Sequence, residues 1–492
     1  MRTDTIAAIA TAMSDAGIGI VRVSGPEAFL IVNKIFRNKF GKKTLLHYES
    51  HTIKYGYIVD EVNGCEWKKN ILDEVMVAVM KAPNTYTMED TVEINCHGGV
   101  LLMQKILELV IKNGARIAEP GEFTKRAFLN GRIDLARAEA VIDVIHSQNE
   151  LALSSSMEQL KGNLSEAVRK MRNKIIYEIA FIESALDDPE HISLDGYEER
   201  LEEIVSDILK ELRKLILSAD NGKLMKEGIN TVIVGKPNAG KSSLLNLLIG
   251  EDRAIVTDIA GTTRDILQES IKLHGIGLNM IDTAGIRSTE DIVEKIGVEK
   301  AKEYAEKADL ILYVVDASRP LDESDRDIIS VIQTKKVIVL LNKSDLDMVV
   351  AEEDIKNLFI SQNKSDYQNN CGSLKENMRG ELPPQNDMHI IRTSTKENIG
   401  MDEFEQIIKK MFFRGEIKAN NEVIITNMRH KEALMDAENS LEMVKQSLEA
   451  HMPEDFYSID LMSAYAFLGL IIGEEVGEDL VNEIFSKFCM GK

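Results

Sequence analysis

The chain has 492 residues, of which 44% are hydrophobic and nine are prolines, so it is long enough for about three domains and too apolar to be mostly disordered. Its four cysteines are far apart and include no Cys-x-x-Cys pair, which argues against a zinc site or a disulfide framework and for a reducing compartment. The formal net charge of −22 excludes nucleic-acid binding by overall charge, so an RNA contact would need a local basic patch or a partner protein.

Residues 1–118 are predicted to form a compact α+β domain. Short β-rich runs, among them Gly19–Val23 and Glu74–Val79, are separated by glycines, and a helix-like stretch extends from Val100 to Ile111. We find no signal peptide and no run of 18 apolar residues, so we expect a cytoplasmic protein without a membrane span.

From about residue 119 the apolar residues recur at the spacing of helices. One stripe runs from Leu153 through Met157 and Leu164 to Ile179, a second covers residues 201–215, and a third covers 434–448. We interpret them as packing faces of one all-α helical domain, made of residues 119–227 and 414–492. An α/β domain of residues 228–413 is then inserted into it, because the two ends of a domain often lie close together.

Within residues 228–413, apolar strands at 231–234, 278–281, 310–315 and 337–341 alternate with helical segments. This order predicts an α/β fold with a mainly parallel sheet. The segment 361–388 is polar and rich in Asn and Ser, so we expect a surface loop there.

The segment Gly235-Lys-Pro-Asn-Ala-Gly-Lys241-Ser242 matches the phosphate-binding pattern G-x-x-x-x-G-K-S. It lies between a predicted strand and a predicted helix, the context that this pattern requires. Its glycines let backbone N–H groups converge on phosphate oxygens, and the helix N-terminus adds favourable partial charge. We expect Lys241 to reach the β- and γ-phosphates and Ser242 to bind Mg²⁺.

Further segments follow in the order that GTP chemistry requires. A threonine of Thr262-Thr263 can complete the Mg²⁺ shell, Asp282-Thr-Ala-Gly285 can hold the metal through water and contact the γ-phosphate, and Ser394-Thr395-Lys396 can contact the guanine oxygen. Asn342-Lys-Ser-Asp345 selects the base, because guanine presents a pair of N–H donors that one carboxylate accepts and adenine does not. A second Asn-Lys-Ser-Asp, at 363–366, follows no buried strand, and we interpret it as coincidence.

The residue that orients the attacking water is not given by this pattern. Many small GTPases place a glutamine directly after the D-x-x-G glycine, where this chain has Ile286. Another polar group must therefore orient water, and a cation must stabilise the transition-state charge. From the residues alone, Glu290, Asp291 and Glu294 all remain candidates.

The chain resembles the MnmE (TrmE) family of bacterial tRNA modification GTPases nearly from end to end. The resemblance is carried by Asp4–Ala8, Gly19–Gly25, Asn95–Gly99, Pro120–Asn130, Gly235–Asn246, Ile255–Asp265 and the terminal segment Phe488–Lys492. The segment 361–388 is longer than the family pattern. The resemblance implies a GTPase that hydrolyses GTP with Lys241, Arg264 and Glu294 as catalytic residues.

The expected GTP-binding residues follow from the motifs and the resemblance together. They are Asn238, Ala239, Gly240, Lys241, Ser242, Ser243, Thr257, Asp258, Ile259, Ala260, Gly261, Thr262, Thr263, Asp282, Thr283, Ala284, Gly285, Asn342, Lys343, Asp345, Ser394, Thr395 and Lys396.

The resemblance also implies the ions and the water-orienting group. Ser242 and Thr263 are the expected Mg²⁺ ligands, and the expected K⁺ ligands are Asn238, Thr257, Ile259 and Thr262. In the family such a K⁺ supplies the charge that an arginine finger supplies elsewhere. The acid that positions water lies in the family's Val-Glu-x-Ile-Gly segment, which here contains Glu294.

For the N-terminal domain, the resemblance implies a homodimer that binds 5-formyl- or 5,10-methylene-tetrahydrofolate. Its expected ligands are Arg22, Glu93, Arg132 and Lys492, whose charges suit an anionic glutamate tail and the N–H groups of a pterin ring. Without the resemblance, Arg22 and Glu93 would be ordinary strand salt-bridge residues. Cys489 fits no prenylation signal and is either a structural cysteine or a residue near the folate.

The resemblance further implies the partners. The family works with MnmG, an FAD protein, most simply as a heterotetramer, to modify C5 of the wobble uridine (position 34) of certain tRNAs. We expect a basic patch that is available to tRNA, made of Lys125, Arg126, Arg132 and Arg137. The alternative interpretation is that these residues form an ordinary solvated helix face. The competing readings are a ribosome-assembly GTPase of the Era or Der type, which lacks the first 120 residues and the Cys489–Lys492 end, and a scaffold for the partner.

Overall fold

The structure is a computed structural model that describes residues 4–60, 67–147, 149–188, 190–193, 195–251, 269–273, 276–281, 307–360, 388–412, 423–489 and 491. Contacts between Cα atoms divide the chain into two compact units. The first consists of residues 1–145, 156–212 and 432–492, and the second of residues 146–155 and 213–431. The chain leaves the first unit and returns to it, as in an inserted domain.

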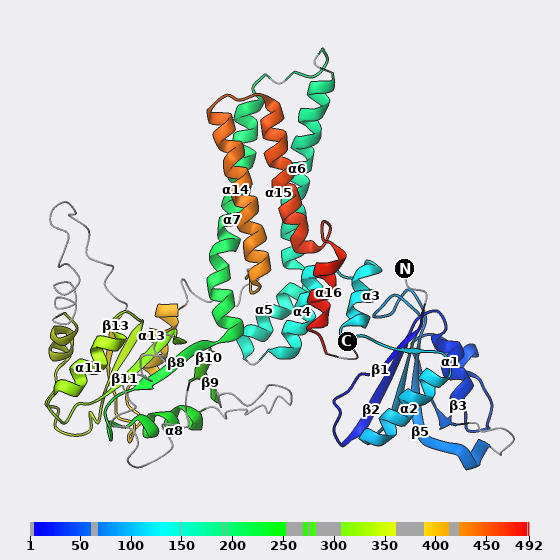
Figure 1. The fold of residues 1–492 in the computed structure, drawn as a ribbon, viewed down its shortest axis with the longest axis horizontal. Helices are drawn as coiled ribbons and strands as arrows, with labels where there is room; N and C mark the ends of the chain where they lie inside the picture. The colour runs from blue at the N-terminus through cyan, green and yellow to red at the C-terminus, as the bar shows by residue number, and fades with distance from the viewer. Residues whose placement is uncertain are drawn as a thin grey trace. The chain divides into compact units, whose positions relative to one another are not determined.

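The N-terminal part of the first unit is an α+β domain on a seven-stranded sheet, in the order β3-β4-β5-β6-β2-β1-β7. Helices α1 (Ala28–Ile35) and α2 (Val100–Lys112) pack on this sheet (Figure 1). Along β5, Val75, Val77 and Val79 are buried while Glu74 and Met76 are exposed, so one face carries the core and the other is open. The strands are β1 (Ile6–Ile9), β2 (Ala16–Ser24), β3 (Phe36–Arg37), β4 (Thr52–Val59), β5 (Ile71–Met80), β6 (Thr91–Gly98) and β7 (Arg116–Ile117), with short 3₁₀ turns at Leu45–His47 and Trp67–Asn70.

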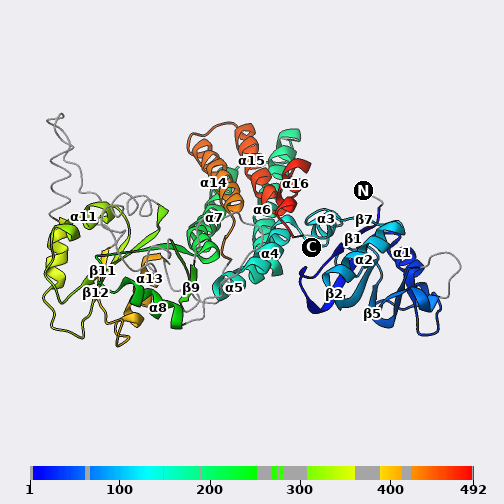
Figure 2. The same ribbon diagram turned by 60° about the horizontal axis from the view of Figure 1, so that its bottom comes forward.

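The remainder of the first unit is helical. Helices α6, α7, α14 and α15 lie side by side in both views (Figures 1 and 2), and α15 packs along α6. The helices are α3 (Glu122–Leu129), α4 (Leu135–His146), α5 (Glu150–Lys161), α6 (Asn163–Asp187), α7 (Tyr197–Glu227), α14 (Met428–Glu449), α15 (Glu454–Ile472) and α16 (Glu478–Ser486). Parts of α5, α7 and α14 belong to the second unit.

The first predicted stripe is wrong at its beginning. Leu164 and Ile179 are buried in the bundle, but Leu153 is 43% and Met157 38% exposed. The cause is Gly162, whose φ of +97° ends α5 and starts α6 in a new direction. A Cβ there would lie 1.9 Å from the Arg137 guanidinium, so the break also depends on close packing. Two helices therefore occupy a segment whose regular apolar spacing predicts one continuous helix.

Helix α15 is, among the described residues, the one helix that is long and apolar enough to cross a membrane by length and composition alone. Tyr457, Leu461 and Leu468 form its buried stripe within the bundle. Its other side is also apolar, because Phe456 and Ile459 are exposed.

The second unit contains an α/β domain on a six-stranded sheet in the order β13-β12-β11-β8-β10-β9. All neighbouring strands pair in parallel except β9 and β10. The four predicted strands are confirmed by β8, β10, β11 and β12, except that Ile281 lies one residue beyond the end of β10. The elements are β8 (Ile229–Val234), α8 (Lys241–Glu251), β9 (Glu269–Leu273), β10 (Ile276–Met280), β11 (Leu310–Asp316), α11 (Glu323–Ile332), β12 (Val337–Asn342), β13 (Met388–Arg392) and α13 (Met401–Phe412).

Every residue of β11 is buried, which is the burial that a central parallel strand requires. Leu312 and Val314 join a core cluster that includes residues of α8 and α13, while Tyr313 and Val315 join a second cluster with residues of α11. Helices thus cover both faces of the sheet. The turns that follow β8 and β12 lie at the carboxyl edge of the parallel sheet, on either side of β11, where α/β sheets bind ligands.

Candidate functional site

The glycine loop between β8 and α8 has positive φ angles, a backbone conformation that few residues other than glycine adopt. Gly235 has φ +151°, Asn238 +63° and Gly240 +107°. A Cβ on Gly235 would lie 2.3 Å from the carbonyl oxygen of Val314, and one on Gly240 would lie 2.1 Å from the side-chain nitrogen of Asn342. The two glycines therefore permit the loop to pack tightly against β11 and against the end of β12.

Lys241, the first residue of α8, lies partly buried beneath this loop. Its ammonium group donates hydrogen bonds to the carbonyl oxygens of Gly235 (2.7 Å) and Lys236 (2.8 Å). Burial lowers the pKa of Lys241. Its hydrogen-bond partners in the described part of the chain are these two carbonyl oxygens. A partly buried cation whose partners are two carbonyl oxygens fits a site that receives an anion.

Asn342 joins three segments of the site. Its side-chain amide donates to the carbonyl oxygen of Ala239 at 2.9 Å and accepts from the backbone N–H of Thr395 at 3.1 Å. The residue is 1% exposed. The glycine loop, the end of β12 and the segment after β13 are thus held together by one side chain.

Asp345 is held by the third of these segments. The Ser394 hydroxyl donates a 2.7 Å hydrogen bond to its Oδ1, and this bond, helped by nearby lysines, lowers the pKa of Asp345. The carboxylate is therefore ionised at neutral pH and keeps lone pairs for two N–H donors of a base.

Lys343 has φ +64°, and its ammonium group contacts Oδ2 of Asp316 at 2.6 Å. Burial opposes the charge of Asp316, but hydrogen bonds from Lys343 and Ser318 outweigh it and lower the pKa of this carboxyl group. Sequence reasoning missed Asp316. The signal available was its place at the end of β11, one strand from Asn342.

Comparison with known proteins decides the family. A family model described as the MnmE helical domain matches residues 135–489, and one described as the GTP-binding protein TrmE N-terminus matches residues 5–132. The chain is 56% identical over 492 residues to the tRNA modification GTPase MnmE of Lachnoclostridium phytofermentans, covering 100% of both chains. It belongs to the MnmE family of tRNA modification GTPases.

Other members give the same picture. The MnmE proteins of Acetivibrio thermocellus and Clostridioides difficile are each 47% identical to it, over 100% and 99% of both chains. Among solved structures, the match to the G domain of the T. maritima FeoB iron transporter covers 37% of this chain and 97% of that chain at 22% identity, with a TM-score of 0.22. As a member of the MnmE family, the chain is a GTP hydrolase that acts in tRNA modification.

Several predicted residues of this MnmE-family site lie outside the described residues. They are Thr257, Asp258, Ile259, Ala260, Gly261, Thr262, Thr263, Arg264, Asp282, Thr283, Ala284, Gly285, Glu294 and Lys492, together with the second Asn-Lys-Ser-Asp at 363–366. Three of the four predicted K⁺ ligands, one of the two Mg²⁺ ligands and the water-positioning acid thus stay predictions.

The N-terminal candidates come together around an aromatic ring. Arg22 of β2 donates to Glu93 of β6 at 2.8 Å and to the carbonyl oxygen of Gly491 at 3.1 Å. The guanidinium groups of Arg22 and Arg132 lie 5.8 and 4.8 Å from the centre of the Tyr86 ring. Tyr86 was missed, because it lies in a turn that has no periodic pattern. The pairing of β2 with β6 places Arg22 opposite Glu93.

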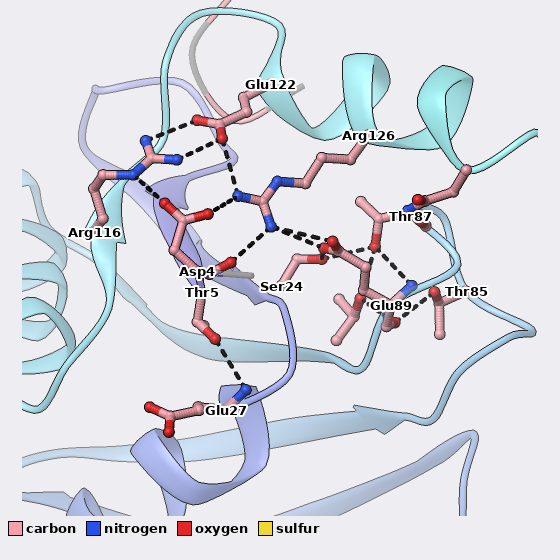
Figure 3. A network of polar contacts seen from close by, with 12 residues as sticks. Asp4, Thr5, Ser24, Glu27, Thr85, Thr87, Glu89, Arg116, Glu122 and Arg126 are labelled. Atoms are coloured by element: carbon pink, nitrogen blue, oxygen red, sulfur yellow. Dashed lines mark hydrogen bonds and ion pairs between the residues drawn. The ribbon is translucent and has the colours of Figure 1, made fainter. Parts of the chain in front are cut away.

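The predicted basic patch is wrong at Arg126, which is 6% exposed. Figure 3 shows its guanidinium between Asp4, Glu89 and Glu122, with hydrogen bonds of 2.8 to 3.2 Å. Arg116 forms a second ion pair with Glu122, at 2.6 Å. Arg126 is thus a cation inside a carboxylate network and is not available to RNA.

Proposed function

We propose that this chain is a potassium-stimulated, dimeric GTPase that, with a flavin-dependent partner of the MnmG type, modifies C5 of the wobble uridine (position 34) of certain tRNAs with a folate one-carbon unit. Membership of the MnmE family supports this proposal as a whole. One observation supports the nucleotide part of the proposal. The Ser394 hydroxyl holds Asp345, the proposed guanine acceptor. Asn342 connects the segment of Ser394 to the glycine loop, whose carbonyl groups accept hydrogen bonds from Lys241.

The proposed ions are Mg²⁺ on Ser242 and Thr263 and K⁺ on Asn238, Thr257, Ile259 and Thr262. Asn238 lies in the glycine loop and Ser242 is the second residue of α8, so both stand beside the proposed phosphate position, which supports this assignment. When bound, K⁺ would supply positive charge beside the transferred phosphoryl group. Turnover measured in K⁺ and in Na⁺ at equal ionic strength tests this proposal. Equal rates would contradict it.

Glu294 is proposed to orient the attacking water, with Lys241 and Arg264 stabilising charge. Replacing Glu294 by Ala should abolish turnover while leaving the Kd for GTP nearly unchanged, since a group that acts only in the transition state does not bind the ground state. Normal K⁺-stimulated turnover in this variant would remove Glu294 from the mechanism.

The proposed folate ligands are Arg22, Glu93, Arg132 and Lys492, and the ligand is 5-formyl- or 5,10-methylene-tetrahydrofolate. The ring of Tyr86 with two guanidinium groups near it supports an anionic aromatic ligand at this place. Calorimetry with 5-formyl-tetrahydrofolate should give binding to the wild type and a clearly weaker Kd for Arg132→Ala. Equal Kd values for the two proteins would contradict the assignment of Arg132.

We further propose a cytoplasmic homodimer that forms a heterotetramer with the FAD protein, and domain limits of 1–118, 119–227 with 414–492, and 228–413. Sedimentation of the full chain tests the dimer. Nuclease digests of tRNA from a deletion strain should lack the modified wobble uridine, and complementation with Glu294→Ala should not restore it. Restoration by this hydrolysis-dead variant would favour the scaffold alternative.

A further inference from the structure

The second residue of the glycine loop, Lys236, forms an ion pair with the start of helix α11. The ammonium group of Lys236 lies 2.7 Å from Oδ2 of Asp325 and 3.0 Å from Oδ2 of Asp322. Both carboxylates stand at the beginning of α11, where Asp322 is the N-cap. A side chain of the phosphate-binding loop is thereby fastened to a neighbouring helix.

Asp325 is a rigid anchor for this pair. Its side chain is 1% exposed, whereas that of Asp322 is 58% exposed. The hydroxyl of Tyr313, in β11, donates to Oδ1 of Asp325 at 2.7 Å, and the backbone N–H of Asp322 donates to Oδ2 at 2.9 Å. Strand, helix start and capping box therefore fix the position of one carboxylate, and Lys236 is the cation that neutralises it.

The glycine loop needs such an anchor to keep its conformation. Its conformation depends on positive φ angles at Gly235, Asn238 and Gly240, and glycine-rich backbone has many alternatives. The carbonyl groups of Gly235 and Lys236 receive their hydrogen bonds from Lys241. The ion pair of Lys236 with the start of α11 adds a further attachment at this end of the loop.

We propose that Lys236 and Asp325 are positioning residues for GTP binding and hydrolysis, which hold the glycine loop in its phosphate-binding conformation by fastening it to the N-terminus of α11. This inference rests on the proposed nucleotide site. It assigns no contact between Lys236 and the nucleotide.

The test uses the full chain and calorimetric titration with GTP, with ITP as a base probe. Asp325→Asn and Lys236→Met should each raise the Kd for GTP about tenfold or more, because a buried charge loses its partner and the loop loses its anchor. Lys236→Arg should bind within about threefold of wild type, since it keeps the charge. Asp322→Asn is the matched control: it removes the exposed partner of the same lysine and should change the Kd less than about twofold.

Two further measurements distinguish the proposed positioning role from a merely structural role. The ratio of the Kd values for ITP and GTP should stay at its wild-type value in Asp325→Asn, because Asp345 still reads the base. Melting curves show whether each variant is folded at the titration temperature. Folded Asp325→Asn and Lys236→Met proteins with wild-type Kd values for GTP would overturn the inference, as would a lower Tm with unchanged Kd. Loss of GTP binding by the wild type itself would instead overturn the proposed nucleotide site.

Discussion

Single polar side chains hold the backbone of the nucleotide site. Asn342 contacts the glycine loop and the segment after β13 with one amide, so its loss would separate segments that lie more than fifty residues apart in the chain. Burial makes this contact effective, because an unpaired polar group inside the protein costs more than a solvated one. The specificity of the site thus depends on residues that do not all touch the ligand.

Ser394→Ala tests the role of the hydroxyl that holds Asp345. Without it the carboxylate loses the hydrogen bond from Ser394 and can rotate, so the Kd for GTP should rise about fivefold while the fold is retained. Isothermal titration measures the change. Ser330→Ala, which removes an exposed hydroxyl on α11, is the control and should bind GTP like the wild type. A Ser394 variant with wild-type affinity would show that the hydroxyl does not orient the acceptor.

His97 offers a test of pH dependence in the N-terminal domain. Its Nδ1 lies 2.7 Å from Asp73, and this hydrogen bond raises the pKa of the imidazole. A raised folded-state pKa means that the pair stabilises the fold fully below the unfolded value of about 6.5 and loses this contribution as the pH rises through the folded pKa. NMR titration should place the midpoint of His97 above 6.5 and lower it in Asp73→Asn.

A His97 midpoint at or below 6.5 in the wild type would contradict the pairing. Because His97 is 72% exposed, the change in stability itself should be small.

At the scale of elements, helix α3 is fastened to the N-terminal sheet by buried charges. Arg126 of α3 contacts Asp4, before β1, and Glu89, before β6. Asn130, directly after α3, donates to the carbonyl oxygen of Thr87 at 2.7 Å. On its other side, Phe128 packs on Phe485 of α16. The helix therefore links the sheet to the C-terminal end of the chain within the first unit.

Arg126→Met should lower the free energy of unfolding of this unit by about 3 kcal/mol, because Glu89 loses its cation and the buried Glu122 keeps only Arg116. Urea denaturation followed by Trp67 fluorescence is the measurement, since Trp67 is the single tryptophan and lies against Tyr57 of β4. Lys125→Met removes the neighbouring cation, whose ammonium group bonds the side chain of Asn482, and should change the midpoint little. Equal losses in the two variants would contradict the network.

The elements show where prediction from sequence works and where it does not. The four central strands and the glycine loop were predicted, because a buried parallel strand is apolar throughout and the loop has a spaced motif. The break at Gly162 was missed, since both sides continue a helical period. Arg126 was wrongly predicted to be a surface cation. Two of its partners, Asp4 and Glu89, are distant in sequence, and no neighbouring residue indicates these contacts.

At the scale of the whole molecule, the chain combines a nucleotide-binding α/β domain with a helical domain and an α+β domain of the MnmE family. The order of motifs predicted this architecture, and the resemblance predicted the family. Tyr86 and the pair Lys236–Asp325 could not be predicted from the sequence, because each depends on elements brought together only by the fold. The function of the whole requires the nucleotide site to be specific for guanine.

Calorimetric titration of the full wild-type chain and of Asp345→Asn with GTP, ATP and xanthosine triphosphate tests that requirement most directly. The wild type should bind GTP with no detectable ATP binding, and Asp345→Asn should lose GTP affinity and gain affinity for xanthosine triphosphate, because an amide in place of the carboxylate offers a donor to the xanthine oxygen. A wild type that prefers ATP, or a variant that keeps its preference for GTP, would contradict the account.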